Sequence, residues 1–394
     1  MRQTKRLFIT FAAALAFTLP VMAQNSSSEV DQLLDLLVAK NIITTTDAVQ
    51  FRETLKKKNQ SAPEATAAPP ANAAVQAQAT KPNAASTPRT IGLKNDTLNI
   101  SGYVQGRFTE APRTTNTFEI RRARLIFDGK LTDTIGYQVQ IDGVKPQLLD
   151  AKVDFKPLKQ FGVTIGQFKI PFSTESYTSD NLLQFVERST VVNSLAPGRD
   201  NSSNGRDIGI QFAGKTLRYK GVDRIEYFGG VFNGAGINVK DDNHFKDEAF
   251  RLVVRPLKQL ALIGNYYNGA TGVKRIGRER TDLEFNFTHK SFSAAGEYIW
   301  GHDGPIHRRG WFTQTSYRVN KWEPLFRFDK YDPRQSTSTI WAVNNYVLGA
   351  NYFLNPYVKL QANFQRQQDL IAKRDANIVL LQTQFQFGGE RSKQ

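Results

Sequence analysis

Between Leu98 and Phe387 the chain alternates apolar and polar residues in short runs. In one late run, Val358, Leu360 and Phe364 share one parity, while Lys359 and Gln361 lie on the other. A period of two places consecutive side chains on opposite faces of a β-strand, so one face is apolar and the other polar. Repeated over so long a region, the pattern predicts an all-β fold: a transmembrane antiparallel β-barrel with lipid outside and water inside.

Turn signals divide residues 95–387 into about sixteen strands. Short turns such as 131–134 and 219–221 alternate with longer connections such as 233–245 and 333–342. Membrane barrels show this rhythm because tight turns lie at the periplasmic end and longer loops at the outer end. The alternation therefore supports a barrel in the outer membrane over a water-soluble sandwich.

The parity of each strand also assigns its faces. In the second strand, Leu125 and Phe127 are expected to face lipid and Arg124 the interior. A charge on the lipid face at mid-depth would cost about 2–4 kcal/mol, which fixes the register. The residues expected to line the pore are Arg107, Arg122, Arg124, Lys130, Lys152, Arg251, Arg327 and Lys359. Acidic residues expected inside, which weaken the positive field, are Asp142, Asp150, Asp154, Glu284 and Asp329.

The first residues have the form of a secretory signal. Three basic residues precede an apolar run over 7–19, and the small-x-small sequence 21–23 predicts cleavage before Gln24. An uncleaved membrane anchor is the alternative. The apolar run is short for that role, since a spanning helix needs about 20 residues. We expect a signal peptide over 1–23 and an exported protein.

Two further segments precede the barrel. Val30, Leu33, Leu34 and Leu37 form a helical apolar stripe, and 24–58 is predicted to be a helical hairpin in the periplasm. Residues 59–94 are rich in Ala and Pro and predict an extended linker, followed by the barrel domain over 95–394. The apolar stripe could serve self-association, docking on the barrel or a periplasmic partner that binds 29–58.

Composition narrows the chemistry. The chain has no cysteine, which excludes disulfides and thiolate sites. Its formal net charge of +16 is typical of proteins that meet nucleic acid, anionic lipid or anionic solutes. Export argues against nucleic acid. His302, His307 and Asp303 lie in a turn context without a recognisable ligand pattern, so neither a metal nor a cofactor is expected.

One connection differs from the others. Residues 171–205 form the longest segment between strands, and the stretch 179–189 is compatible with a helix. Leu182, Leu183, Phe185 and Val186 within it require burial. Long loops in compact domains are usually functional, and this one is expected to fold into the barrel and narrow it.

Four motifs occur in order: Phe118-x-x-Arg121-Arg122-Ala123-Arg124-Leu125, Gly166-Gln167-Phe168-Lys169-x-Pro171-Phe172, Phe185-x-Glu187-Arg188-Ser189 and Gly205-Arg206-Asp207-x-Gly209. Together they resemble the phosphate-selective porin O and P family over nearly all of 97–387. The resemblance implies a sixteen-stranded homotrimeric porin whose third loop constricts the pore. It places at the constriction and along the anion path Lys169, Glu187, Arg188, Arg199 and Arg206. Alternatively, Arg188 forms a structural ion pair with Glu187 or Asp207.

The chain departs from that family in one respect. Between 171 and 205 the basic residues are Arg188 and Arg199, with four acidic residues among them, so no dense arginine cluster is evident. We therefore expect a porin without catalytic activity that passes small hydrophilic solutes, with a weak preference for anions that extends to phosphate or another oxyanion. A structural or anchoring barrel with partner-binding helices is the alternative, and an outer-membrane enzyme is unsupported.

The partners follow from this interpretation. They are outer-membrane lipid and lipopolysaccharide, small anions and two further copies of the chain. Basic residues expected in outer loops, among them Arg278, Arg280, Arg308 and Arg309, would attract anions or pair with lipopolysaccharide phosphates.

Overall fold

A computed structural model of the chain describes residues 45, 49, 98–272, 276–333 and 342–388. The chain divides into two units, 1–85 and 86–394. In the first unit only Thr45 and Val49 are described, and both have helical backbone. The expected signal peptide, the rest of the hairpin and the linker lie outside the described residues.

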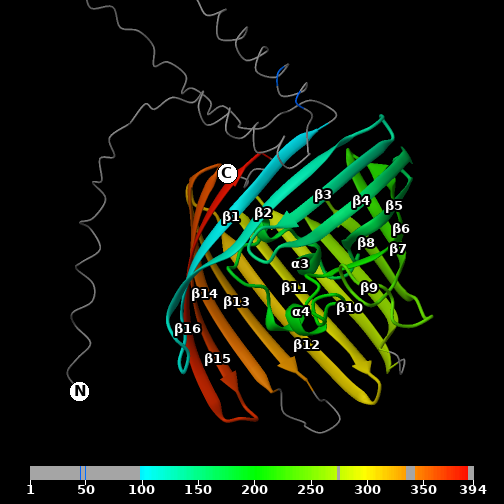
Figure 1. The fold of residues 1–394 in the computed structure, drawn as a ribbon. Helices are drawn as coiled ribbons and strands as arrows, with labels where there is room; N and C mark the ends of the chain where they lie inside the picture. The colour runs from blue at the N-terminus through cyan, green and yellow to red at the C-terminus, as the bar shows by residue number, and fades with distance from the viewer. Residues whose placement is uncertain (1–44, 46–48, 50–97, 273–275, 334–341, 389–394) are drawn as a thin grey trace, which may run out of the picture. The chain divides into compact units, whose positions relative to one another are not determined.

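The second unit contains a closed barrel of sixteen antiparallel strands (Figure 1), as the sequence predicts. Each strand pairs with its neighbours in sequence, and β1 pairs with β16 to close the ring. The strands are β1 (Asn99–Glu110), β2 (Thr117–Lys130), β3 (Ile135–Asp142), β4 (Gln147–Leu158), β5 (Phe161–Lys169), β6 (Arg206–Tyr219), β7 (Val222–Phe232), β8 (Asp247–Leu257), β9 (Leu260–Thr271), β10 (Ile276–His289), β11 (Phe292–Asp303), β12 (Ile306–Tyr317), β13 (Trp322–Asp332), β14 (Val343–Asn355), β15 (Val358–Asp369) and β16 (Arg374–Phe387).

The connections differ between the two ends of the barrel. Every even-numbered strand from β2 to β14 passes to the next through a short turn of two to four residues. The longest connections, 170–205 and 233–246, follow odd-numbered strands and so lie at the other end. The predicted rhythm holds only in part: β3, β9 and β15 pass to the next strand through four residues each, and β11 and β12 are joined by Gly304 and Pro305 alone.

The two faces of the strands differ as the alternation predicts. On β10, Leu283 and Phe285 point outward and are 57 % and 39 % exposed. The side chain of Asp282 points inward and is fully buried. Similar exposed apolar residues recur on all the other long strands, so the outside carries a large apolar surface. A surface of this kind favours contact with lipid over contact with water.

The segment 170–205 folds into the barrel, and we call it the inward loop (Figure 1). It contains two short α-helices, α3 (Thr174–Tyr177) and α4 (Thr190–Leu195), and a 3-10 turn, η1 (Asp180–Leu182). The side chain of Ser189 caps α4 by accepting a hydrogen bond from the Val192 amide at 3.2 Å. No helix in the described part of the chain is long and apolar enough to cross a membrane.

The expected helix over 179–189 is wrong in extent, because only η1 within it is helical. After η1 the backbone bends over 184–187, and Asp180 and Glu187 reach basic residues of the wall. Of the four apolar residues expected to be buried, Leu183, Phe185 and Val186 are buried, whereas Leu182 is 37 % exposed.

Candidate functional site

Apolar contacts fix one side of the inward loop. Val191, Val192 and Leu195 of α4 are fully buried in a cluster that includes wall residues of β11, β12 and β13. Farther back in the loop, Phe185 packs with Leu325 and Val347. Burying a side chain of this size contributes about 1.5–3 kcal/mol, so these contacts hold the loop inside the barrel.

Four arginines of β1 and β2 face the opposite side of the loop, and we call them the arginine wall: Arg107, Arg121, Arg122 and Arg124. Strict alternation would point Arg121 and Arg122 to opposite faces. The pairing of β1 with β2 shifts at a β-bulge, because Gln105 lies opposite Arg122 and Gly106 opposite Ile120. Arg121 is the extra residue, and a bulge of this kind redirects a side chain. It therefore reaches the interior, where its Nε lies 3.1 Å from Glu187.

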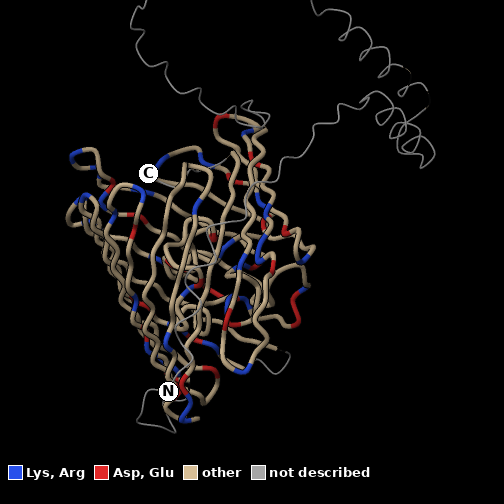
Figure 2. Tube along the Cα trace, turned by 90° about the vertical axis from the view of Figure 1, so that its left-hand side faces the viewer, with Lys and Arg blue, Asp and Glu red and all other residues tan. Residues whose placement is uncertain are grey.

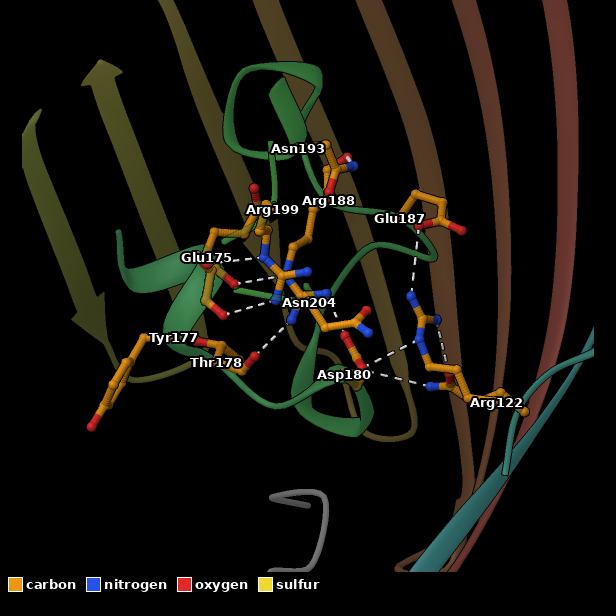
Figure 3. A network of polar contacts seen from close by, with 12 residues as sticks. Arg122, Glu175, Tyr177, Thr178, Asp180, Glu187, Arg188, Asn193, Arg199 and Asn204 are labelled. Carbon is orange, nitrogen blue, oxygen red and sulfur yellow. Dashed lines mark hydrogen bonds and ion pairs between the residues drawn. The ribbon is translucent and has the colours of Figure 1, made fainter. Parts of the chain in front are cut away.

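Asp180 is the carboxylate around which the arginine wall is arranged (Figure 3). It forms ion pairs with Arg188 of the loop, with Arg122 at 3.3 Å and with Arg124 at 3.8 Å. Its side chain is only 10 % exposed. Removal of one partner from such a buried ion pair strongly destabilises a protein, because the other charge stays buried without compensation. Asp180 therefore holds the inward loop against the wall.

Glu187 makes a second set of ion pairs with the same wall. It contacts Arg107, Arg121 at 3.1 Å and Arg122 at 3.7 Å. Arg107 also pairs with Glu119 of β2. Glu187 and Arg121 keep 26 % and 34 % of their side chains exposed, so this part of the wall faces the open interior.

Arg188 lies inside the fold of the loop. It pairs with Asp180 and donates hydrogen bonds to the carbonyl oxygens of Glu175 at 2.9 Å and Thr178 at 2.7 Å. Its side chain is 2 % exposed. The geometry favours the structural alternative, with Asp180 as the partner in place of Glu187 or Asp207. A solute cannot contact a guanidinium that is buried in this way.

Arg199 has no carboxylate in ion-pair distance among the described contacts. Its Nε donates to the Ser176 hydroxyl at 2.9 Å, and its Nη2 donates to the Ser176 carbonyl at 3.0 Å. Figure 3 shows it beside Arg188. Its positive charge is thus balanced less well than that of Arg188.

Most other expected pore residues also hold the loop or pair with the wall. Lys169 donates to the Thr178 carbonyl at 2.7 Å, and Lys359 donates to the Leu183 carbonyl at 3.0 Å. Arg206 forms a two-pronged ion pair with Asp150 at 2.8 and 2.9 Å, both buried. Contacts of this type are charge-assisted and geometrically specific.

Arg251 and Arg327 bind the part of the loop around α3. Arg251 pairs with Glu284 at 2.8 Å and donates to the Thr174 hydroxyl at 2.6 Å. Arg327 pairs with Glu175 at 3.2 Å and lies over the ring of Phe185 at 4.5 Å. Both guanidinium groups are therefore occupied by the protein itself.

Lys130 and Lys152 make no hydrogen bond or ion pair with the inward loop among the described contacts, although Lys152 lies close enough to Tyr177 of α3 to interact with it electrostatically. Lys130 is exposed at the end of β2. Lys152 pairs with Asp154 at 3.3 Å and keeps 23 % of its side chain exposed.

All four basic residues expected in outer loops lie in strands, and Arg308 and Arg309 belong to β12. Arg278 and Arg280 belong to β10 and are buried, with Asp200 of the inward loop at 3.2 and 3.4 Å. They point inward because they share the parity of Asp282. They therefore also hold the loop, and do not form a basic rim.

The charges of the loop alter its pKa values. Burial alone would raise the pKa of Asp180, but Arg188 and Arg122 outweigh it and hold that pKa well below its ordinary value. Burial likewise tends to raise the pKa of Glu187, but the positive charges of Arg122 and Arg121 outweigh this effect and lower that pKa. Burial and repulsion from Arg188 lower the pKa of Arg199 well below its ordinary value. Both carboxylates are thus stably ionised, whereas Arg199 carries a poorly compensated charge.

Sequence reasoning missed Arg121, Glu175 and Asp180 as site residues. Arg121 stands in the first motif, but its parity assigns it to the lipid face. Asp180 and Glu175 were counted only as acidic residues of the loop. Their partners lie on strands distant in sequence, so no local signal identifies them.

Figure 2 shows basic and acidic residues intermixed within the barrel and at its ends. The arginine wall is matched mainly by the loop, through Asp180 and Glu187. Such an arrangement can attract and repel ions.

Comparisons with known proteins agree with this geometry. The sequence matches the family model of phosphate-selective porin O and P over residues 99–261, which include all four motifs. No curated protein matches the sequence.

Several solved structures share the fold. An anion-selective porin from Comamonas acidovorans has 13 % identity and a TM-score of 0.57, and the match covers 74 % of this chain and 99 % of that one. OmpF of Salmonella typhi, solved with daunomycin, has 12 % identity and a TM-score of 0.56, with 75 % and 100 % covered. A loop L8 deletion mutant of OmpT, an outer membrane protein of Vibrio cholerae, has 12 % identity and a TM-score of 0.54, with 74 % and 99 % covered.

At these identities the structures establish the fold alone, and the family model covers the first half of the barrel. The chain therefore has the porin fold of outer-membrane proteins, and its resemblance to the phosphate-selective porin O and P family is confirmed over residues 99–261.

Proposed function

We propose that the chain is an outer-membrane porin that passes small hydrophilic solutes by passive diffusion, with a modest preference for anions. The observation that carries this proposal is the inward loop, which is held by buried ion pairs across a closed barrel with an apolar exterior. An inward loop of this kind narrows a wide barrel and brings solutes close to fixed charges.

The modest size of the preference follows from charge matching. Basic residues around the loop are Arg107, Arg121, Arg122, Arg124, Lys169, Arg188, Arg199 and Arg206. Acidic residues in the same region are Glu119, Asp142, Asp150, Glu175, Asp180, Glu187 and Asp200. The basic residues are only slightly in excess, so the field favours anions weakly.

Strong phosphate selection is not favoured by these contacts. An oxyanion site needs several guanidinium or ammonium groups that are free to donate to the ligand. Arg188, Arg206 and Lys359 are buried and already donate to the protein. Arg121 and Lys152 keep 34 % and 23 % of their side chains exposed, and we assign the anion preference mainly to them.

The finer features of the proposal rest on analogy. The porin fold supports a homotrimer, since OmpT of Vibrio cholerae has been solved in a trimer form. We further propose that lipid and lipopolysaccharide surround the barrel, and that segment 29–58 contacts a partner in the periplasm.

Single-channel recording in a planar lipid bilayer tests the proposal. The purified protein is expected to give discrete conductance steps, and a salt gradient is expected to give a reversal potential on the anion-selective side. A protein that inserts without conducting would overturn the porin and support the closed structural barrel. A cation-selective reversal potential would overturn the anion preference alone.

A further inference from the structure

Three carboxylates of β10 and β11 form a compact group inside the barrel, and we call them the acidic wall: Asp282, Glu284 and Glu297. Asp282 and Glu284 are two residues apart on one strand, so both point inward. Glu297 lies directly opposite Glu284 in the pairing of the two strands. One carboxylate oxygen from each residue lies within 4.8 Å of the other two.

This arrangement carries a large unbalanced charge. Like charges directly opposite each other on neighbouring strands destabilise a sheet. Within the described residues, the one ion pair made by the acidic wall joins Glu284 to Arg251 at 2.8 Å. Three carboxylates and one guanidinium leave an excess of about two negative charges if all are ionised.

Two oxygens of the acidic wall also have no hydrogen-bond partner among the described residues. They are Oδ1 of Asp282 and Oε1 of Glu297, whose residues are 0 % and 4 % exposed. The other oxygen of Asp282 accepts from the Asn265 amide at 2.7 Å, which also donates to Glu284. A buried carboxylate oxygen without a partner is costly, and an ion is one of the few groups that satisfies it.

We propose that the acidic wall binds one Ca²⁺ ion. Carboxylate oxygens are hard ligands that suit Ca²⁺ and Mg²⁺ better than softer metals. A site built from protein carboxylates suits Ca²⁺ better than Mg²⁺, because Mg²⁺ dehydrates reluctantly and usually keeps several of its waters. The two charges of Ca²⁺ also match the local excess of negative charge.

The ion would also strengthen the attachment of the inward loop. The backbone amide of Thr174, the first residue of α3, donates to Glu284 at 3.0 Å. The hydroxyl of the same residue accepts from Arg251 at 2.6 Å. A neutralised acidic wall therefore keeps these two contacts in place, since it removes the repulsion that would push Glu284 away from Glu297.

Isothermal titration calorimetry of the refolded full-length mature protein tests the site. The protein is refolded in detergent without lipopolysaccharide, which itself binds divalent cations, and is stripped with EGTA. Wild type is expected to bind one Ca²⁺ per chain and to bind Mg²⁺ at least tenfold more weakly. Asp282→Asn and Glu297→Gln are expected to lose at least tenfold in Ca²⁺ affinity. Asp154→Asn is the matched control, because Asp154 faces the interior but has Thr164 and Lys152 as partners, and it is expected to bind as wild type does.

Absence of Ca²⁺ binding by folded wild type would overturn the proposal and favour protonated carboxyl groups instead. Equal binding by the two variants and wild type would also overturn it. If a variant fails to refold, the site is tested in wild type by the luminescence of bound Tb³⁺, which Ca²⁺ is expected to displace. Luminescence that Ca²⁺ does not reduce would overturn the site. Conductance is measured separately, so a conducting barrel without Ca²⁺ binding refutes only this inference, and a non-conducting barrel that binds Ca²⁺ refutes only the porin.

Discussion

The arginine wall of β1 and β2 and the acidic wall of β10 and β11 hold the same inward loop with opposite charges. On the arginine wall, the loop supplies the counter-charges itself, through Asp180 and Glu187. On the acidic wall, the loop supplies no positive charge among the described contacts, only hydrogen bonds from the Thr174 amide to Glu284 and from Ser173 to Glu297, and the ion pair comes from Arg251. The charges of the arginine wall are therefore balanced by ion pairs within the chain, whereas the acidic wall keeps an excess of negative charge.

This difference separates attachment from selectivity. Guanidinium groups that bind the loop tightly are buried and unavailable to solutes, as Arg188 shows. Selectivity must then come from charges that remain exposed, such as Arg121, or that remain unbalanced, such as the acidic wall. A count of basic residues in the loop alone would miss both.

Removal of Asp180 is the strongest test of the comparison. Asp180→Asn leaves Arg188, Arg122 and Arg124 without their shared partner, and the loss of one side of a buried ion pair costs about 3–5 kcal/mol. We expect the loop to detach, with noisy, larger conductance and faster hydrogen exchange over 178–188. Glu119→Gln is the control, because Glu119 is 40 % exposed and surface pairs contribute about 0–1 kcal/mol. A quiet channel with wild-type exchange in Asp180→Asn would show that the arginine wall does not hold the loop.

Acid should weaken the arginine wall by the same route. The pKa of Asp180 in the folded protein is held well below its ordinary value, so its ion pairs contribute fully above about pH 4 and are lost as the pH falls through the lowered pKa. Channel noise is expected to stay constant from pH 7 to pH 5 and to rise only in stronger acid. Asp180→Asn should be noisy throughout this range. Noise that rises already between pH 7 and pH 5 would contradict the assignment to Asp180.

Reversal of an exposed charge should change selectivity without detaching the loop. Arg121→Glu changes two charges beside the path, and one charge at about 4 Å is worth about 1 kcal/mol in water. The ratio of anion to cation permeability should therefore fall several-fold, as measured from reversal potentials. Lys130→Glu makes the same change at the exposed end of β2 and is expected to have little effect. An equal fall of the permeability ratio in both variants would show that a charge in the arginine wall affects selectivity no more than a charge at the end of the strand.

Ca²⁺ should have the smallest effect, on the acidic wall. If the ion binds there, saturating Ca²⁺ raises the anion preference of wild type by less than about twofold, because the added charge is screened over a Debye length of about 10 Å. Glu297→Gln should not respond. A similar response in both proteins would assign the effect to other surfaces.

The strands could be predicted from the sequence because lipid and water impose opposite demands on alternate residues. On β10, outward Leu283 and inward Glu284 could be told apart without knowledge of any partner. The bulge at Arg121 could not be found in this way, because a single inserted residue is defined only by the pairing of β2 with β1. The expectation that Arg278 and Arg280 lie in a loop is wrong because β10 begins at Ile276, so both residues belong to the strand.

The roles of the charged residues were harder to predict than their faces. Arg188 and Lys169 do lie at the inward loop, as the motifs predict, yet the geometry gives them backbone carbonyls and Asp180 as partners. These contacts depend on how the loop folds back on itself. The sequence predicts that Glu284 faces inward, but a local pattern cannot group it with Glu297, because the two residues meet only when β10 pairs with β11.

The pairing of β1 with β16 joins residues from the two ends of the barrel domain, as Gly102 lies opposite Phe387. A side chain at Gly102 would lie 2.4 Å from the Arg124 carbonyl oxygen and 2.8 Å from the Phe387 ring, so this seam admits only glycine there. Until the final strand has been synthesised, the first keeps an open edge that can recruit foreign strands. Assembly of such a ring must therefore be nearly all-or-none, and a chain that lacks its last strand should aggregate instead of forming a smaller barrel.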